Sequence, residues 1–294
     1  MDAFFQQVIN GISLGSVYAL ISIGYTMVYG IIKLINFAHC DIFMVGAYTG
    51  YFAVSTLRLG FFGAMLFTMT VCALLGILIE RVAYKPLRNS AKETLLITTI
   101  GVELLLQNLI KTKALAGPNT LNFPELIANK TYEIAGIKFS NLQMITLAVT
   151  VVCCIGLQIL IHKTSTGRAM RATSYDRDAA ALMGININKI ISVTFAIGSA
   201  LAATGGIIFG MAYPKLEPAM GVMPGLKGFV AAVLGGIGVI PGAMFGGIAI
   251  GLIETLSKVY ISSGFSDAIA FILLIMILLI KPTGLFGKKK SVKV

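Results

Sequence analysis

The polar residues that could act chemically lie inside or beside long apolar segments. Four of them lie where two such segments follow each other with almost no linker: Lys33, Asn36, His39 and Asp41. An interruption of this kind is either an ordinary turn at the membrane surface or a broken helix whose unpaired backbone groups face a translocation path. In the second case Asn36 and His39 are candidate residues of the path.

A second candidate is the pair Glu103 and Gln107, four residues apart and therefore on one face of a helix. A carboxylate at bilayer depth is costly, so it normally faces the bundle interior or water. We expect a structural hydrogen bond or a place on the translocation path, with Lys227 as a possible charge partner. Glu254 and Lys258, also four apart, indicate an ion pair at the membrane edge.

No catalytic or metal-binding set stands out. His39 and His162 lie in no HExxH-like or triad-like context, and no GxxxxGK[ST] loop is present to hydrolyse ATP. The four cysteines lack metal-ligand spacing and suit apolar packing. We therefore expect a protein that is not an enzyme and that has no cofactor and no metal site.

The elements that must position these residues are apolar helices. Of 294 residues, 57% are hydrophobic and 12% charged, whereas soluble domains are about 45–50% apolar and roughly 25% charged. Apolar segments recur near 8–31, 40–57, 61–80, 94–110, 141–162, 190–213, 240–260 and 264–280. Since a span needs ~20 apolar residues, we predict an all-α integral membrane protein, a polytopic bundle of about 8–9 transmembrane helices. It forms one domain over 1–294.

Glycine-rich segments add two expectations. The stretch 225–238 is either a short ninth span or a re-entrant piece, since irregular backbone at membrane depth is tolerated only where protein or water covers it. Gly242 and Gly246, and likewise Gly247 and Gly251, fit the small-xxx-small pattern that lets helix backbones approach closely. This pattern predicts a tight bundle.

The basic residues predict the orientation. The net charge is +11, and Lys and Arg cluster in the regions 81–92, 163–189 and 281–293. Short basic loops remain on the cytoplasmic side, so we expect these regions there and no nucleic-acid partner. The polar segment 112–140 is then external, with a small hairpin or an irregular cap at 132–140. The N-terminus is outside if 225–238 crosses the membrane and inside if it is re-entrant.

The loop 163–189 contains a short helix. Ser174 is a plausible N-cap, Asp176 and Asp178 follow in the first turn, and Gly184 marks the end. A capped helix on the cytoplasmic face, preceded by Arg168 and Arg171, indicates a docking element. The alternative is a solvated amphipathic turn.

Several longer motifs resemble those of one family. They are "NGISLGSVYALISIGYTMVYGIIKLINFAH" (10–39), "VGAY" (45–48), "ERVAYKPLR" (80–88), "GRAMRA" (167–172), "LMGIN" (182–186), "AAVLGGIGVIPGAMFGG" (231–247) and "KPTGLFG" (281–287). These motifs extend over almost the whole length and occur in the order typical of the family. By them the chain resembles a branched-chain amino acid ABC transporter permease. More specifically, it is similar to the first of the two permease subunits of the Leu/Ile/Val importer.

The resemblance implies a multi-pass protein of a bacterial-type cell membrane that translocates Leu, Ile and Val. Its partners would be the lipid bilayer, a second related permease subunit, two ATP-binding cassette subunits and an external solute-binding protein. The loop 163–189 would be the ATPase-coupling region, on which the following residues fall: Arg168, Arg171, Ala172, Asp176 and Gly184. One departure is Cys40, where the family usually has Gly, which weakens the expectation of a left-handed or closely packed glycine there.

Other functions remain open at this point. Related ABC permeases serve urea, short amides or other amino acids, and the chain gives little information on its cargo. A stand-alone channel or secondary transporter is another class, although a proton- or sodium-coupled carrier usually has more intramembrane carboxylates than the clear Glu103. An enzyme embedded in the membrane has no residue set to support it.

Overall fold

The computed structural model describes residues 2–33, 36–88, 90–113, 115–134 and 136–287. The helices are α1 (Asp2–Ile32), α2 (His39–Ser55), α3 (Phe61–Ile79), α4 (Lys92–Ile110), α5 (Asn141–Lys163), α6 (Ser165–Tyr175), α7 (Arg177–Leu182), α8 (Ile187–Ala212), α9 (Val222–Gly235), α10 (Ile240–Tyr260) and α11 (Ser266–Ile280). A π-helical turn, η1 (Glu80–Tyr84), follows α3, and a 3-10 turn, η2 (Ser263–Phe265), precedes α11. The strands are β1 (Leu121–Asn122), β2 (Thr131–Ile134), β3 (Ile137–Ser140) and β4 (Lys215–Leu216).

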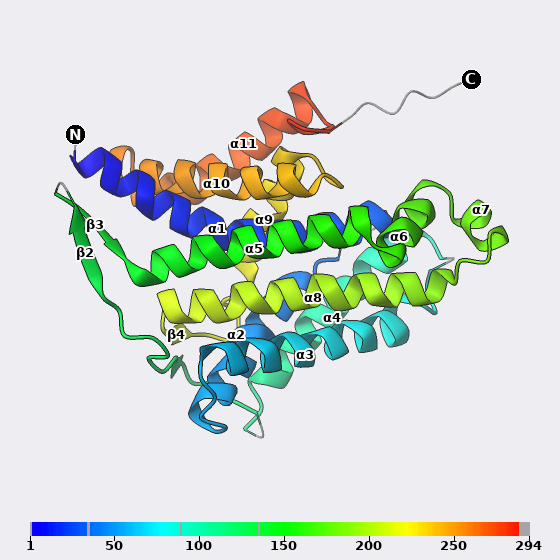
Figure 1. Ribbon diagram of the computed structural model, residues 1–294, viewed down its shortest axis with the longest axis horizontal. Coiled ribbons are helices and arrows are strands. Elements are labelled where there is room, and N and C mark those ends of the chain that lie inside the picture. The colour runs from blue at the N-terminus through cyan, green and yellow to red at the C-terminus, as the bar shows by residue number, and fades with distance from the viewer. Residues whose placement is uncertain (1, 34–35, 89, 114, 135, 288–294) are drawn as a thin grey trace.

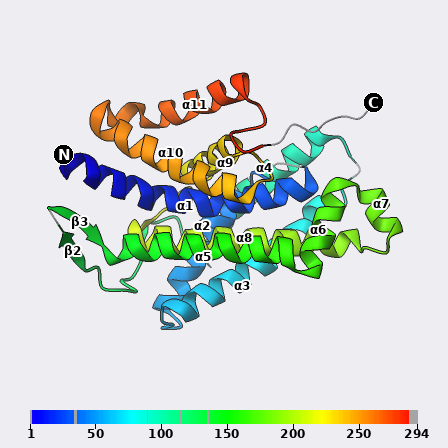
Figure 2. The same ribbon diagram turned by 45° about the horizontal axis from the view of Figure 1, so that its top comes forward.

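The long helices lie side by side along the longest axis of the molecule (Figures 1 and 2). The strands β2 and β3 and the start of α1 lie at one end, which we call the hairpin end. The helices α6 and α7 lie at the other end (Figure 1). We call this the α7 end.

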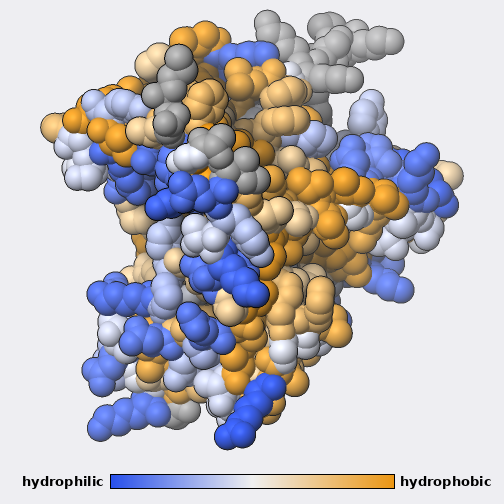
Figure 3. Space-filling view, turned by 60° about the vertical axis from the view of Figure 1, so that its left-hand side comes forward, coloured by the Kyte–Doolittle hydropathy of each residue, from blue (hydrophilic) through white to orange (hydrophobic). Residues whose placement is uncertain are grey.

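The predicted bundle is confirmed, because each of the expected apolar segments contains a helix. Among the residues that the structure describes, seven helices are long and apolar enough to cross a membrane: α1, α3 with η1, α4, α5, α8, α10, and α11 with η2. The helices α2 and α9 are shorter, with 17 and 14 residues. A space-filling view shows a broad hydrophobic band beside the hydrophilic hairpin end (Figure 3).

Helix α1 lies at the centre of the bundle, packed against α10, α8, α9 and α5. It is apolar on all sides, as expected of a helix that is buried all round. Its closest neighbour is α10, where a Cβ on Gly251 would collide with the backbone of Gly15, and one on Gly247 with that of Ala19. The glycine spacing therefore lets these two helices touch backbone to backbone.

The helix α2 begins well inside the molecule rather than at its α7 end. An added Cβ at Gly24 of α1 would lie 2.5 Å from His39 Nε2, at the first residue of α2. Since Gly24 precedes the end of α1 by eight residues, α2 starts about 12 Å from that end, at 1.5 Å per residue. The start of α2 therefore lies inside the bundle, as a broken helix predicts.

The helix α9 begins at the same depth. An added Cβ on Gly221 or Gly225 would collide with Cys40, in the first turn of α2. At its other end, Leu234 accepts a hydrogen bond of 2.8 Å from the amide of Leu285, in the chain after α11. Cys40 is helical and buried. The helices α2 and α9 approach closely here because α9 has glycines at the contact, so no glycine is needed at position 40.

The segment between α8 and α10 crosses the bundle, which decides between the two expectations for 225–238. After α8 the chain lies at the hairpin end, where β4 pairs antiparallel with β1, and it then passes through α9 to the α7 end. The start of α1 lies at the hairpin end too, since Gln6 Nε2 donates to the Lys138 carbonyl at 2.7 Å. The N-terminus and the segment 112–140 are therefore on the same side.

The hairpin predicted at 132–140 is present. Strands β2 and β3 pair antiparallel with Tyr132 opposite Phe139 and Glu133 opposite Lys138. Ser140 then caps α5, accepting from the Gln143 amide at 3.2 Å while Gln143 Oε1 accepts from the Ser140 amide at 2.9 Å. This reciprocal capping box joins the hairpin directly to α5.

Replacement of Gly251 by valine tests the backbone contact between α1 and α10. We expect Gly251→Val to lower the stability of the detergent-purified protein by about 1–3 kcal/mol or more, because overpacking displaces a helix. Gly156→Val on α5 is the matched control, since no atom lies within 4 Å of its added Cβ. Thermal unfolding followed by size-exclusion chromatography measures both variants, and equal melting temperatures would contradict the packing described.

Candidate functional site

The helix α6 folds back against the end of α5. Thr164 Oγ1 accepts from the Gly167 amide at 3.0 Å and begins α6. Gly167 leaves no room for a Cβ, because the carbonyls of Leu160 and Ile161 lie against it. The "GRAMRA" motif therefore needs its glycine for the tight crossing of α5 and α6.

The N-cap of α7 is Asp176 rather than the predicted Ser174. Asp176 Oδ1 accepts from the amides of Asp178 at 2.9 Å and Ala179 at 3.0 Å. Ser174 lies in α6, which continues to Tyr175. The prediction was wrong because it treated the residues before Asp176 as a loop, whereas they form a separate helix.

Gly184 ends α7 as predicted. Its φ is +81°, a left-handed conformation that glycine adopts without strain. The Gly184 amide donates to Ala181 at 2.9 Å and the Ile185 amide donates to Ala180 at 3.1 Å, which is a Schellman motif. A helix with satisfied groups at both ends is a defined structural element rather than a linker.

The tip of α7 is apolar and exposed. Tyr175, Leu182 and Met183 are 89%, 90% and 83% exposed. The helix α7, which lies between Tyr175 and Met183 in the chain, projects beyond the bundle (Figure 1). Exposed apolar groups on a small projecting element are typical of a protein–protein contact.

Two arginines connect this segment to the ends of the long helices. Arg171 donates to the Ile161 carbonyl near the end of α5, and Arg177 donates to the Ile32 carbonyl at the end of α1. A guanidinium at a helix C-terminus satisfies free carbonyls and interacts favourably with the helix dipole. Arg168 is exposed on α6, and Ala172 is partly buried.

Sequence reasoning missed the role of Arg177, which it treated only as part of a basic loop. The feature of the sequence that could have indicated this role is the position of Arg177 directly after the N-cap of α7, which keeps its side chain close to the bundle. Through Arg177 the shortest helix of the α7 end is connected to the central helix α1.

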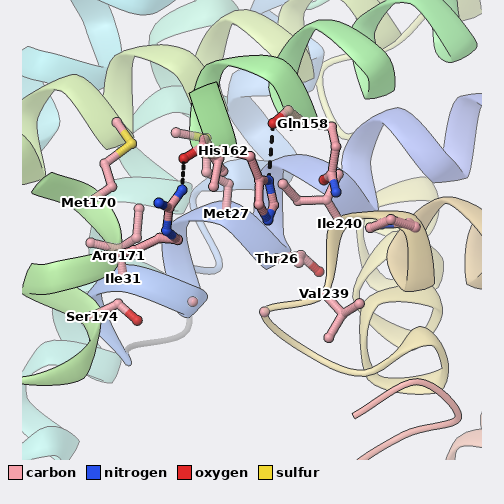
Figure 4. Close-up of a pocket in the computed structure, with 14 residues that line it drawn as sticks. Thr26, Met27, Ile31, Gln158, His162, Met170, Arg171, Ser174, Val239 and Ile240 are labelled. Carbon is pink, nitrogen blue, oxygen red and sulfur yellow. Dashed lines mark hydrogen bonds between the residues drawn. The ribbon is translucent and has the colours of Figure 1, made fainter. Parts of the chain in front are cut away.

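A cavity of about 350 Å³ separates α6 from the bundle (Figure 4). Its walls come from α1, α5, α6 and the turn before α10: Thr26, Met27, Gly30, Ile31, Gln158, Ile161, His162, Met170, Arg171, Ser174, Gly238, Val239, Ile240 and Pro241. His162 Nδ1 lies 3.1 Å from the Gln158 carbonyl. The helix α6 contacts α1 beside this cavity, and the cavity itself is unfilled space between α6 and the bundle.

The candidate path residues do not converge on one point. Asn36 is buried, and its Oδ1 accepts from the Tyr84 hydroxyl at 2.6 Å. His39 is buried against α1, with its ring 4.6 Å from that of Tyr25. Both side chains therefore hold the broken helix in place, one against η1 and the other against α1.

Gln107 and Glu103 lie beside the start of α2. Gln107 Nε2 donates to Asp41 Oδ1 at 3.2 Å, and Glu103 is partly buried one helical turn away. Asp41 is fully buried, and its Oδ2 has no hydrogen-bond partner in the part of the chain that the structure describes. The break between α1 and α2 thus has two neighbouring carboxylates.

Lys227 is not the partner of Glu103. It contacts Glu254 at 2.8 Å and Asp267 at 2.6 Å, because α9 lies beside α10 and α11. Glu254 also accepts from Tyr18 at 2.8 Å and from Lys258 at 2.6 Å. The expected pair at the membrane edge is therefore part of a buried network, in which Glu254 is only 1% exposed.

The motif "ERVAYKPLR" forms a second ionic contact that the sequence did not reveal. Glu80 Oε1 accepts from Arg88 at 2.6 Å and its Oε2 accepts from Ser192 at 2.6 Å. Arg88 also donates to Asn188 Oδ1 at 2.7 Å. These bonds attach the turn after α3 to the first turns of α8.

Comparisons with known proteins agree with this architecture. The family model described as "Branched-chain amino acid transport system / permease component" matches residues 7–278. The permease protein LivH of the high-affinity branched-chain amino acid transport system is 41% identical in Salmonella typhimurium (strain LT2) and in Escherichia coli (strain K12). The corresponding BraD of Pseudomonas aeruginosa is also 41% identical.

These alignments extend over nearly the full length of both partners. In each of the three cases they cover 99% of this chain and 98% of the relative. The matched region includes the broken helix, the α6–α7 segment and all or most of each of the nine helices that the described residues form in the bundle. The chain is a multi-pass membrane protein and belongs to the family of branched-chain amino acid transport system permease components.

Proposed function

We propose that this chain is a permease subunit of an ATP-driven importer and passes Leu, Ile and Val across the membrane. The full-length similarity to permeases of branched-chain amino acid systems is the observation that carries the proposal. A solute-binding protein delivers the amino acid at the hairpin end, which is the external side. A second, related permease subunit completes the path.

Two ATP-binding cassette subunits supply the energy from the α7 end. The exposed apolar tip of α7 and its caps at Asp176 and Gly184 support a docking role for this helix. The clustering of basic residues in 163–189 supports its placement on the cytoplasmic side. Arg168, Arg171 and Ala172 belong to the same coupling segment.

Movement of α7 reaches the bundle through the two arginine contacts. Arg177 connects it to the last turn of α1, and Arg171 connects α6 to the last turns of α5. The cavity beside α6 gives the segment room to move (Figure 4). Since α1 ends directly before the break, displacement of its last turn alters the contact of α2 with α9.

The carboxylates at the break favour an amino acid as the cargo over urea or a neutral amide. Glu80 is paired with Arg88, and Glu254 with Lys227, whereas Asp41 and Glu103 have no ion pair in the described part of the chain. An unpaired carboxylate at membrane depth is costly. The α-ammonium group of an amino acid would neutralise it during passage, and urea has no such charge.

The double variant Arg171→Ala/Asp176→Ala tests the coupling role. We expect leucine uptake by the reconstituted transporter to fall at least about fivefold, because loss of the cap costs about 1 kcal/mol and the tie to α5 is lost as well. Insertion into the membrane and ATP hydrolysis should persist. Lys163→Ala/Lys189→Ala, at exposed positions of the same region, is the control, and normal ATP-driven uptake by the first variant would argue against coupling.

Glu103→Gln tests the path. We expect a higher KM for leucine, by about tenfold if the carboxylate provides ~1.4 kcal/mol of interaction with the ammonium group. Asn108→Ala serves as control, since Asn108 is exposed on α4 and bonds the Leu104 carbonyl of its own helix. Uptake of radiolabelled leucine, with urea and other amino acids as competitors, measures both variants. An unchanged KM, or competition by urea, would refute this assignment.

Purification distinguishes the importer from a stand-alone channel or secondary carrier. An importer permease should retain ATP-binding subunits when it is isolated from its native membrane in mild detergent. Leucine transport by this chain alone, without ATP, would instead favour a channel or carrier.

A further inference from the structure

The cavity between α6 and the bundle is lined by buried polar groups that have no partner. Thr26 of α1 is only 1% exposed, and its Oγ1 has no hydrogen-bond partner in the described part of the chain. Gln158 Oε1, on α5, is buried and likewise lacks a partner among the described residues. Both side chains line the same cavity of about 350 Å³ (Figure 4). Because an unsatisfied buried polar group is costly, these two groups favour a ligand that brings hydrogen-bond donors of its own.

The same cavity has a cationic group at its rim. Arg171 and His162 line it and are exposed at the α7 end, so this side is open to water. One bond of the Arg171 guanidinium is to the Ile161 carbonyl, and further N–H donors of the guanidinium remain for a ligand. No Asp or Glu is among the lining residues that the structure describes. A carboxylate can therefore approach Arg171 without meeting a like charge.

The remaining walls of the cavity are mostly apolar. Four of the apolar lining residues, from α1, α6 and α10, are buried: Met27, Ile31, Met170 and Ile240. Sites for small molecules typically combine such walls with a few placed polar groups, in a volume of about 300–1,000 Å³. The cavity therefore offers a cation for a carboxylate, acceptors for an ammonium group and an apolar surface for an aliphatic side chain.

We propose that this cavity is a regulatory site that binds a branched-chain amino acid from the cytoplasmic side. The carboxylate bonds Arg171, the α-ammonium group donates to Gln158 Oε1 and to the Thr26 hydroxyl, and the aliphatic side chain contacts the apolar walls. Asp41 and Glu103, at the break between α1 and α2, are not among the described lining residues, so the site is separate from the candidate path. That this ligand is the transporter's own product, arriving from the cytoplasm, rests on the proposed function.

A bound amino acid would oppose coupling. It contacts α1 through Thr26 and α6 through Arg171, so it connects two elements whose relative movement the coupling segment requires. It also fills the space into which α6 would move. Amino acid that accumulates in the cytoplasm therefore slows further import.

Uptake in the presence of enclosed amino acid tests this regulation. The complete transporter is reconstituted in proteoliposomes that contain ATP and increasing concentrations of unlabelled L-leucine, and the initial uptake of radiolabelled leucine is measured. The readout is the ratio of uptake with and without enclosed leucine, which we expect to fall severalfold. Enclosed leucinamide, which lacks the carboxylate, and the α-keto acid of leucine, which lacks the ammonium group, should require at least about tenfold higher concentrations, since hydrogen bonds to charged groups are the strong ones.

Thr26→Val removes the unpartnered hydroxyl with little change of shape. We expect this variant to need about tenfold more enclosed leucine for the same inhibition, because a hydrogen bond to the ammonium group is lost. Gln158→Leu should act in the same direction. Thr68→Val on α3 is the matched control, since Thr68 Oγ1 is also buried without a partner among the described residues but does not line the cavity.

Equilibrium binding of radiolabelled leucine to the detergent-purified transporter, without the solute-binding protein, is a measurement that does not depend on transport. Both threonine variants carry Glu103→Gln here, so that the candidate path contributes little. Thr26→Val should bind leucine about tenfold more weakly than Thr68→Val.

Uptake that enclosed leucine leaves unchanged, or equal inhibition of the two threonine variants, would overturn the regulatory site and leave the proposed function intact. An absence of uptake even without enclosed leucine would count against the proposed function instead. In that case the binding measurement still decides on the cavity, and equal leucine binding by Thr26→Val and Thr68→Val would overturn it.

Discussion

Two helices of this bundle begin part-way through it, and their first turns pack against each other. Cys40 of α2 lies against Gly221 and Gly225 at the start of α9, with no space for a side chain at either glycine. In the first turn of α2, the carbonyls of residues 36–38 accept from the amides of residues 39–41 at 3.2 Å. In hydrocarbon each unsatisfied group would cost several kcal/mol, so a helix can begin at this depth only where protein, here the start of α9, covers its first turn.

The surrounding elements depend on this junction. His39 and Asn36 anchor it to α1 and η1, and Gln107 of α4 contacts Asp41 just beyond it. The central helix α1 ends directly before the break and is connected through Arg177 to the α7 end. A displacement received at an exposed helix therefore has a short covalent and hydrogen-bonded route to the place where two half-length helices meet. We regard this route as the physical basis of coupling in this permease.

The apolar segments, the hairpin at 132–140 and the end of α7 at Gly184 followed from local rules of hydropathy, pairing and capping. The N-cap of α7 could not be predicted in this way, because Ser174 and Asp176 are both residue types that cap helices. Only the position at which α6 ends decides between them. The partner of Lys227 was also misplaced, since α9 is a half-length helix whose neighbours depend on where the chain enters the bundle. Arg177 could not be separated from other basic residues, because its contact with α1 joins segments 145 positions apart.

Reactivity of Cys40 in the complete transporter tests the central claim most directly. Cys72, Cys153 and Cys154 are first replaced by serine or alanine, so that the buried Cys40 is the remaining thiol. If ATP-driven movement of α7 opens the junction of α2 and α9, a small methanethiosulfonate reagent should modify Cys40 several-fold faster during ATP hydrolysis. The acceleration should be absent in Arg177→Gln. A modification rate that ATP leaves unchanged, while leucine uptake proceeds, would contradict the account.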